Sequence, residues 1–236
     1  MSGIFETIRV VEGCAPLLEL HLARMRRSAR ALGLPEVPRG EDLALPAGDR
    51  VLRLTLEPDG LHSQVRPLPE GMECERREGI VLPARPEAWP DPGHKRIDRA
   101  VQARMERLAG GEAARLDREG RIWESTRSNL FVVGEGALET AEPPSVLPGI
   151  ARAIVLQAAR TLGVRVIHRS PRVRETGLGL EAFATNAVRG LRPVRAIGAL
   201  RFAGPGPLTR ALQRALDVRM GLRPGPPPQG SAGAAR

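Results

Sequence analysis

Many short strand-like segments, with helices scattered irregularly among them, are the feature that most constrains the fold of this chain. The strands are predicted where apolar residues alternate or run together between Gly, Pro and acidic turns. They lie at 4–11, 51–57, 62–68, 79–82, 113–116, 121–124, 129–133, 137–140, 164–168, 181–185 and 193–197. Helical spacing of apolar residues predicts helices at 17–33, 98–109, 150–162 and 207–221. Because the order lacks regular βαβ alternation, it predicts an α+β or mixed α/β fold with two lobes.

A proline-rich stretch marks the expected division between the lobes. Residues 83–93 contain four prolines and end in a glycine, a composition typical of exposed connections. We therefore expect a small N-terminal α/β domain over 1–83, a linker over 84–94 and a larger domain over 95–222. The residues that follow, 223–236, are rich in Pro, Gly and Ala, and we expect this tail to be disordered.

Composition argues against several classes of protein. The chain has 236 residues and 42% hydrophobic content, enough for a sizeable core. Its apolar runs are too short for a membrane span, and the first residues lack the basic and apolar regions of a secretory signal. The two cysteines, Cys14 and Cys74, are too few for a disulfide scaffold or a zinc site. We expect a cytoplasmic protein without a metal.

The formal net charge of +9 raises the alternative of a module that binds nucleic acid or another polyanion. Basic and acidic residues are interspersed, however, and aromatic residues make up only 3% of the chain. A stacking platform for bases is therefore not expected. The positive charge suits anionic small molecules equally well, because arginine binds carboxylates and phosphates.

Lysine is almost absent, although Lys and Arg together number 36: Lys95 is the single lysine. Arginine keeps the charge but cannot form a Schiff base, so chemistry that needs an amine must use Lys95 or the N-terminus. Glu124 ends a predicted strand, and Gly149 and Ile150 begin a predicted helix whose free N–H groups can bind a phosphate. Taken one at a time, each feature also has an ordinary explanation: a lysine exposed to solvent, a carboxylate at the end of a hairpin, and a plain helix start. Together they provide what pyridoxal phosphate needs: an amine for the aldehyde, a carboxylate for the ring nitrogen and a phosphate seat.

With these residues the sequence resembles the class IV aminotransferase family, the fold-type IV pyridoxal-phosphate enzymes. Matching motifs occur in the family's order and spacing over most of the chain. They are Phe5-Glu-Thr-Ile-Arg9, Leu20-His-Leu-Ala-Arg24, Lys95, Glu124-Ser-Thr-Arg-Ser-Asn-Leu-Phe131, Leu147-Pro-Gly-Ile-Ala-Arg152, and Phe183-Ala-Thr-Asn-Ala187 followed by Arg192-Pro-Val194.

The resemblance implies a role for each site residue. Lys95 is expected to bond the cofactor covalently and to move protons, and Glu124 to pair with the pyridine nitrogen. The phosphate is expected to bind the backbone N–H groups of Gly149 and Ile150, the loop residues Asn186 and Ala187, and the basic Arg53. The resemblance also implies a homodimer with the cleft between the lobes.

Within the family, residues 185–194 and the compact size most resemble the lyases that convert 4-amino-4-deoxychorismate to 4-aminobenzoate and pyruvate. Branched-chain and D-amino-acid aminotransferases of the same fold use active-site tyrosines, and this chain has no tyrosine. An aminotransferase remains the alternative, since it shares the cofactor residues, and a family member without activity is a further one. Arg189 and Arg192 are the arginines expected to meet a dianionic substrate.

Overall fold

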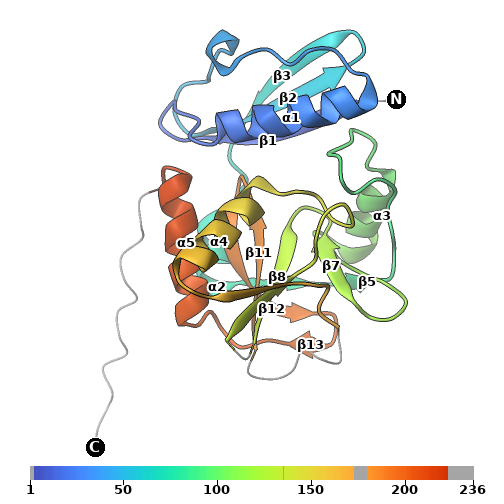
Figure 1. Cartoon of the computed structure of the whole chain (residues 1–236), viewed down its shortest axis with the longest axis vertical. Coiled ribbons are helices and arrows are strands. Elements are labelled where there is room, and N and C mark those ends of the chain that lie inside the picture. The colour runs from blue at the N-terminus through green and yellow to red at the C-terminus, as the bar shows by residue number, and fades with distance from the viewer. Residues whose placement is uncertain (1–2, 135, 173–179, 223–236) are drawn as a thin grey trace, which may run out of the picture.

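The computed structural model describes residues 3–134, 136–172 and 180–222. In this part of the chain, the N-terminal sheet has three antiparallel strands in the order β1 (Ile4–Val10), β2 (Arg50–Glu57) and β3 (Gly60–Arg66). Helix α1 (Leu18–Leu32) packs along β1, and a short 3₁₀ turn, Gly40–Asp42, follows it. This layer pair forms the upper part of the molecule in Figure 1.

The two faces of β1 have different roles. Its alternation places Ile4, Glu6, Ile8 and Val10 on one side, where the apolar members join a core with α1 and β2. Phe5 lies on the opposite side and faces the rest of the molecule, because its ring stacks with cations of the segment around Lys95. The small sheet therefore supplies one wall of the region in which Lys95 lies.

The described residues form a second sheet of ten strands. Its main path runs β13-β12-β11-β8-β7-β6-β5, with β4 beside β12 and β9 and β10 extending from β8. The strands are β4 (Ile80–Leu82), β5 (Ala84–Arg85), β6 (Ala114–Leu116), β7 (Ile122–Ser125), β8 (Asn129–Gly134), β9 (Ala137–Thr140), β10 (Arg165–His168), β11 (Glu181–Asn186), β12 (Gly190–Ile197) and β13 (Leu200–Arg201). Most neighbours are antiparallel, but β4–β12, β5–β6 and β9–β10 are parallel.

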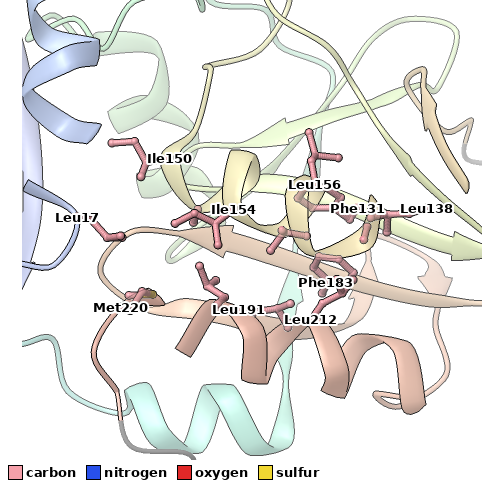
Figure 2. Close-up of a cluster of buried hydrophobic side chains, with 14 residues drawn as sticks. Leu17, Phe131, Leu138, Ile150, Ile154, Leu156, Phe183, Leu191, Leu212 and Met220 are labelled. Carbon is pink, nitrogen blue, oxygen red and sulfur yellow. The ribbon is translucent and has the colours of Figure 1, made fainter. Parts of the chain in front are cut away.

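Four further helices surround this sheet in the described residues: α2 (Met72–Glu78), α3 (Ala100–Ala109), α4 (Ile150–Thr161) and α5 (Pro207–Arg219). Helices α4 and α5 pack on each other and on β11, and their core contains Phe131 and Phe183 stacked with ring centres 4.8 Å apart. Figure 2 shows Leu17, from the segment before α1, beside Ile150 and Met220 in this cluster. The packing thus joins the N-terminal layer to the start of α4.

The two-lobed α+β fold is confirmed, and the predicted helices are present within one or two residues of their expected ends. Helix α2 was not predicted, because among its residues only Met72 is buried and its charged sequence has no apolar periodicity. It follows Gly71, whose φ of +69° is the left-handed conformation that glycine adopts without strain.

The passage between the sheets comes earlier than the proline-rich stretch. Strand β4 pairs with β12, and α2 packs against the same strand, so the chain enters the second sheet between β3 and α2. The segment 84–94, expected to be the linker, contains β5 and the buried Trp89. A division into domains at residue 83 remains a prediction from composition. The tail over 223–236 lies outside the described residues. Within the described residues, no helix is long and apolar enough to span a membrane.

Candidate active site

A cleft lies where four segments meet. The segments are 89–102, 124–129, 147–151 and 185–187, and Arg24 from α1 joins them. Six of the expected site residues line this cleft: Lys95, Glu124, Gly149, Ile150, Asn186 and Ala187. Residues separated by almost a hundred positions in the sequence are therefore brought to one place.

Lys95 is fixed by backbone bonds to β1. The Phe5 N–H donates to the Lys95 carbonyl at 2.9 Å, and the Ile97 N–H donates to Gly3 at 3.0 Å. The ammonium nitrogen lies 5.0 Å from the centre of the Phe5 ring. Burial lowers the pKa of Lys95 to about 7, an effect to which the positive charge of Arg24 adds. A large fraction of this amine is therefore neutral near pH 7, as a nucleophile or base requires.

Glu124 lies in the β7–β8 hairpin, directly opposite Asn129. The side chain is 4% exposed, and its Oε2 accepts the Leu147 N–H at 3.0 Å and the Asn129 amide at 3.5 Å. Burial raises the pKa of Glu124 to about 7, although the Leu147 hydrogen bond opposes this rise. A cationic ring nitrogen bound next to it would favour the ionised form.

The start of α4 has the features of an anion-binding helix N-terminus. Gly149 is the N-cap, and a Cβ there would lie 2.0 Å from Asn129 Oδ1, so no side chain fits. The Gly149 N–H itself donates to the Leu147 carbonyl at 2.8 Å. The N–H groups of Ile150 and the next residues, which have no partner within the helix, are therefore available to bind an anion.

The loop after β11 provides the facing wall. Asn186 Oδ1 accepts the N–H groups of Val188 and Arg189 at 3.0 and 2.7 Å, so its side chain shapes this loop. Its amide donates to Ser128 Oγ at 3.1 Å. The Thr185 hydroxyl, also on the cleft, is buried and has no hydrogen-bond partner among the described residues. An unpaired buried hydroxyl in the same cleft as a helix N-terminus fits a phosphate group.

Arg24 is a cleft residue to which the sequence analysis gave no role. Its Nε and Nη2 bind both oxygens of Glu6, at 2.7 and 2.6 Å, and its Nη1 donates to the Pro148 carbonyl at 3.1 Å. It thus brings a positive charge from the small domain to the start of α4. The motif that contains Arg24, residues 20–24, resembles the family's motif. The direction of the Arg24 side chain, however, depends on its contact with Pro148, 124 residues further along the chain. Arg53 does not line the cleft; its guanidinium lies 3.9 Å over the Phe5 ring, and its phosphate-binding role stays a prediction.

The structure directs Arg189 and Arg192 away from the substrate role expected for them. Both bind Glu75 Oε2, at 2.8 and 3.0 Å, and Arg192 also binds Glu112 at 2.8 Å. Neither lines the cleft. The partly buried carboxylates Glu75 of α2 and Glu112 of the loop before β6 hold them, which sequence spacing does not reveal. In the described part of the chain, the arginines that line the cleft are Arg24, Arg96, Arg99 and Arg127.

Comparison with known proteins agrees with this geometry. The profile of the class IV aminotransferases matches residues 3–197, and the chain therefore belongs to this family. The match confirms the resemblance drawn from the motifs and, with it, pyridoxal phosphate as the cofactor.

Individual relatives have different activities in their names. A branched-chain-amino-acid aminotransferase from Pseudomonas aeruginosa is 31% identical over 120 residues, which are 49% of this chain and 39% of that protein. The chain thus spans less than half of that relative's length. The same holds for branched-chain-amino-acid aminotransferase-like protein 1 from Arabidopsis thaliana, of which the chain covers 45%.

Solved structures share the fold over nearly the whole chain. A 4-amino-4-deoxychorismate lyase from Pseudomonas aeruginosa is 29% identical, with a TM-score of 0.79 and coverage of 92% of this chain and 90% of that one. An aminotransferase from Brucella abortus, solved with pyridoxal phosphate, has a TM-score of 0.75 at 22% identity, with coverage of 93% and 89%.

Proposed function

We propose that the protein is a pyridoxal-phosphate lyase that converts 4-amino-4-deoxychorismate to 4-aminobenzoate and pyruvate. The observation that carries this proposal is the excess of positive side chains in the cleft, which Arg24, Arg96, Arg99, Arg127 and Lys95 line together with Asp91, Asp98 and Glu124. Three of these arginines also pair with carboxylates, Arg24 with Glu6, Arg96 with Asp91 and Arg127 with Glu106. The substrate is a dianion, which arginines bind well, whereas a branched-chain amino acid needs an apolar pocket for its side chain. Likeness to the Pseudomonas aeruginosa lyase over nine-tenths of both chains supports the same assignment.

The residues of the cleft fit the cofactor. Glu124 would hold the ring nitrogen, and the phosphate would lie between the Ile150 N–H, the Thr185 hydroxyl and the Arg24 guanidinium. Asn186 and Ala187 would complete the phosphate loop. When bound, pyridoxal phosphate supplies an electron sink for the charge left behind when a carbon–hydrogen bond breaks.

Lys95 would carry the protons of the reaction. With a pKa of about 7, its amine can accept the proton from the carbon that bears the substrate's amino group and later give it to the departing enolpyruvate, which becomes pyruvate. Pyruvate then departs from the adjacent carbon, and the ring that remains becomes aromatic. The cleft arginines would hold the substrate's carboxylates and so orient that carbon toward Lys95.

An aminotransferase is the second candidate, because the curated relatives of this chain include branched-chain aminotransferases. It would use the same Lys95 and Glu124. The purified protein with pyridoxal phosphate and 4-amino-4-deoxychorismate should release pyruvate, measured with lactate dehydrogenase, without any keto acid. A strict need for a keto acid acceptor would contradict the lyase assignment.

We also propose a cytoplasmic homodimer that binds no nucleic acid, as the family resemblance and the dispersed charges suggest. Light scattering behind a sizing column should give twice the mass of 25.5 kDa. A monomer with full activity would contradict the dimer.

A further inference from the structure

Arg192 in β12 is buried, with 2% of its surface exposed. Its Nη1 donates to Glu75 Oε2 at 3.0 Å, and its Nη2 donates to Glu112 Oε2 at 2.8 Å. Taking a guanidinium out of water costs free energy, and an apolar side chain of similar volume often leaves a protein equally stable. Leu191 and Val194, nearby on the strand, are apolar and fully buried. The stability of the sheet therefore does not by itself explain an arginine at this position.

The same guanidinium also reaches a residue of the cleft. Arg192 Nη2 donates to Ser128 Oγ at 2.8 Å, and Ser128, itself 5% exposed, lines the cleft. The Ser128 oxygen accepts a second hydrogen bond, from the side-chain amide of Asn186 at 3.1 Å. A hydroxyl oxygen has two lone pairs, so these two donors occupy both of them. Ser128 therefore joins a buried positive charge to the side chain of Asn186.

The register of the sheet brings these side chains together. In the antiparallel pair of β11 and β12, Ala184 lies opposite Arg192, and Asn186 lies opposite Gly190. Alternate residues of a strand share one face, so Arg192 and Asn186 are diagonal neighbours on the same face, within reach of a long side chain. Ser128 directly precedes β8, which pairs with β11 on its other side. The connection is thus built into the pairing of three strands.

Asn186 holds the loop that follows β11. Its Oδ1 accepts the N–H groups of Val188 and Arg189 at 3.0 and 2.7 Å. Because only the amide oxygen can accept these bonds, the amide nitrogen is the end that faces Ser128. Asn186 and Ala187 both line the cleft. Whatever fixes the Asn186 amide therefore also fixes the backbone of the loop at the cleft.

We propose that Arg192 is a positioning residue for the cofactor's phosphate: through the Ser128 hydroxyl it fixes Asn186 and thus the loop after β11. The proposal rests on the proposed role of Asn186 and Ala187 in binding that phosphate. A loop that is already in place binds a ligand without the free-energy cost of ordering it at that moment. Arg192 itself does not line the cleft, so its effect on the cofactor is exerted through Ser128.

Two other arginines hold the same loop, by backbone carbonyls of residues that do not line the cleft. Arg9 Nη1 donates to the Val188 carbonyl at 3.1 Å, and Arg76 Nη1 donates to the Arg189 carbonyl at 3.3 Å. These bonds fix where the loop turns. By contrast, the connection through the serine hydroxyl ends on Asn186, a side chain that lines the cleft.

Pyridoxal, which lacks the phosphate, separates this role from a general loosening of the fold. Equilibrium dialysis with the full-length protein, freed of cofactor, gives the dissociation constants of pyridoxal phosphate and of pyridoxal. Ser128→Ala breaks the connection and leaves the ion pairs of Arg192 intact. It should weaken pyridoxal phosphate binding about tenfold and change pyridoxal binding by less than about twofold, since one well-placed hydrogen bond to a charged group is lost. Asn186→Ala should have the same effect.

Arg192→Met is combined with Glu112→Gln, so that Glu112 is not left charged without its partner, while Glu75 keeps its ion pair with Arg189 at 2.8 Å. This double variant should also weaken pyridoxal phosphate binding about tenfold. Glu112→Gln alone keeps the bond from Arg192 to Ser128 and is the matched control, with a change of less than about twofold. In a Ser128→Ala background, the double variant should cause less than about twofold further loss, because both changes break the same connection. Circular dichroism establishes that the compared proteins are folded.

Unchanged affinity for pyridoxal phosphate in Ser128→Ala, in Asn186→Ala or in the folded double variant would overturn the proposal. Equal weakening of pyridoxal phosphate and pyridoxal would overturn it as well, and so would effects of Ser128→Ala and of the double variant that multiply. Failure of the proposed reaction has a different signature: the affinities would change as expected, while the wild-type protein would release no pyruvate from 4-amino-4-deoxychorismate.

Discussion

Glu6 in the small domain and Glu124 in the cleft are two carboxyl groups with nearly equal burial, 1% and 4% exposed. Burial raises the pKa of both, but at Glu6 the contacts of Arg24 and His21 outweigh it and hold the pKa far below its usual range. Glu124 has no ion pair within 4 Å among the described residues, and its pKa rises to about 7. Burial alone therefore does not decide the charge state; a guanidinium in direct contact does.

The contrast separates a structural group from a functional one. Glu6 is fully paired and ties β1 to α1, so it gains nothing from a ligand. Glu124 and Lys95 lie unpaired at a pKa near neutrality, where a bound cofactor can supply the missing partner. Perturbed groups of this kind in a cleft are typical of active sites.

Lys95→Arg should give the largest effect, because it keeps the charge of the cleft and removes only the reactive amine. Turnover should fall by at least about a thousandfold, which corresponds to about 4 kcal/mol, measured as pyruvate release. Added pyridoxal phosphate should also lose the visible absorbance that the wild type gives. Arg104→Lys, an exchange between the same two residue types outside the cleft, where Arg104 pairs with Glu87, serves as the control and should keep most activity. Comparable turnover in Lys95→Arg would mean that charge, not the amine, matters here.

Glu6→Gln should destabilise the protein next most strongly, since it leaves the Arg24 guanidinium, 5% exposed, without its counter-charge. Removing one partner of a buried ion pair costs about 3–5 kcal/mol, measurable by urea unfolding. Glu41→Gln, in an exposed pair with Arg39, should change stability by less than about 0.5 kcal/mol. A Glu6→Gln loss as small as this would show that the two carboxyls do not differ as described.

Glu124→Gln should have the opposite effect to Glu6→Gln and stabilise the cofactor-free protein. The folded-state pKa of Glu124, about 7, exceeds the unfolded value of 4.5, so its stabilising contribution is complete below pH 4.5 and is lost as the pH rises to 7. The variant should therefore gain stability over the wild type above pH 7, by about 3 kcal/mol, and lose that advantage below pH 4.5. Urea unfolding at pH 8 and pH 4.5 measures both; a gain that is equal at the two values would contradict the shifted titration.

Local patterns predicted much of the fold. Strand alternation and helical periodicity gave β1, β2, α1 and α4 nearly at their observed ends, because such periodicity reflects which face each element buries. Helix α2 and the entry into the second sheet were missed, because α2 is held by contacts with β12, more than a hundred residues further along.

The sequence by itself determined the chemical inventory: a single lysine, a carboxylate at a hairpin and a glycine at a helix start, in the order of the class IV aminotransferases. The tertiary structure decided how these groups behave. It turned Arg24 toward the start of α4 and engaged Arg189 and Arg192 with Glu75. Residue type and spacing are written along the chain, but charge state and direction depend on desolvation and on partners that only folding brings together.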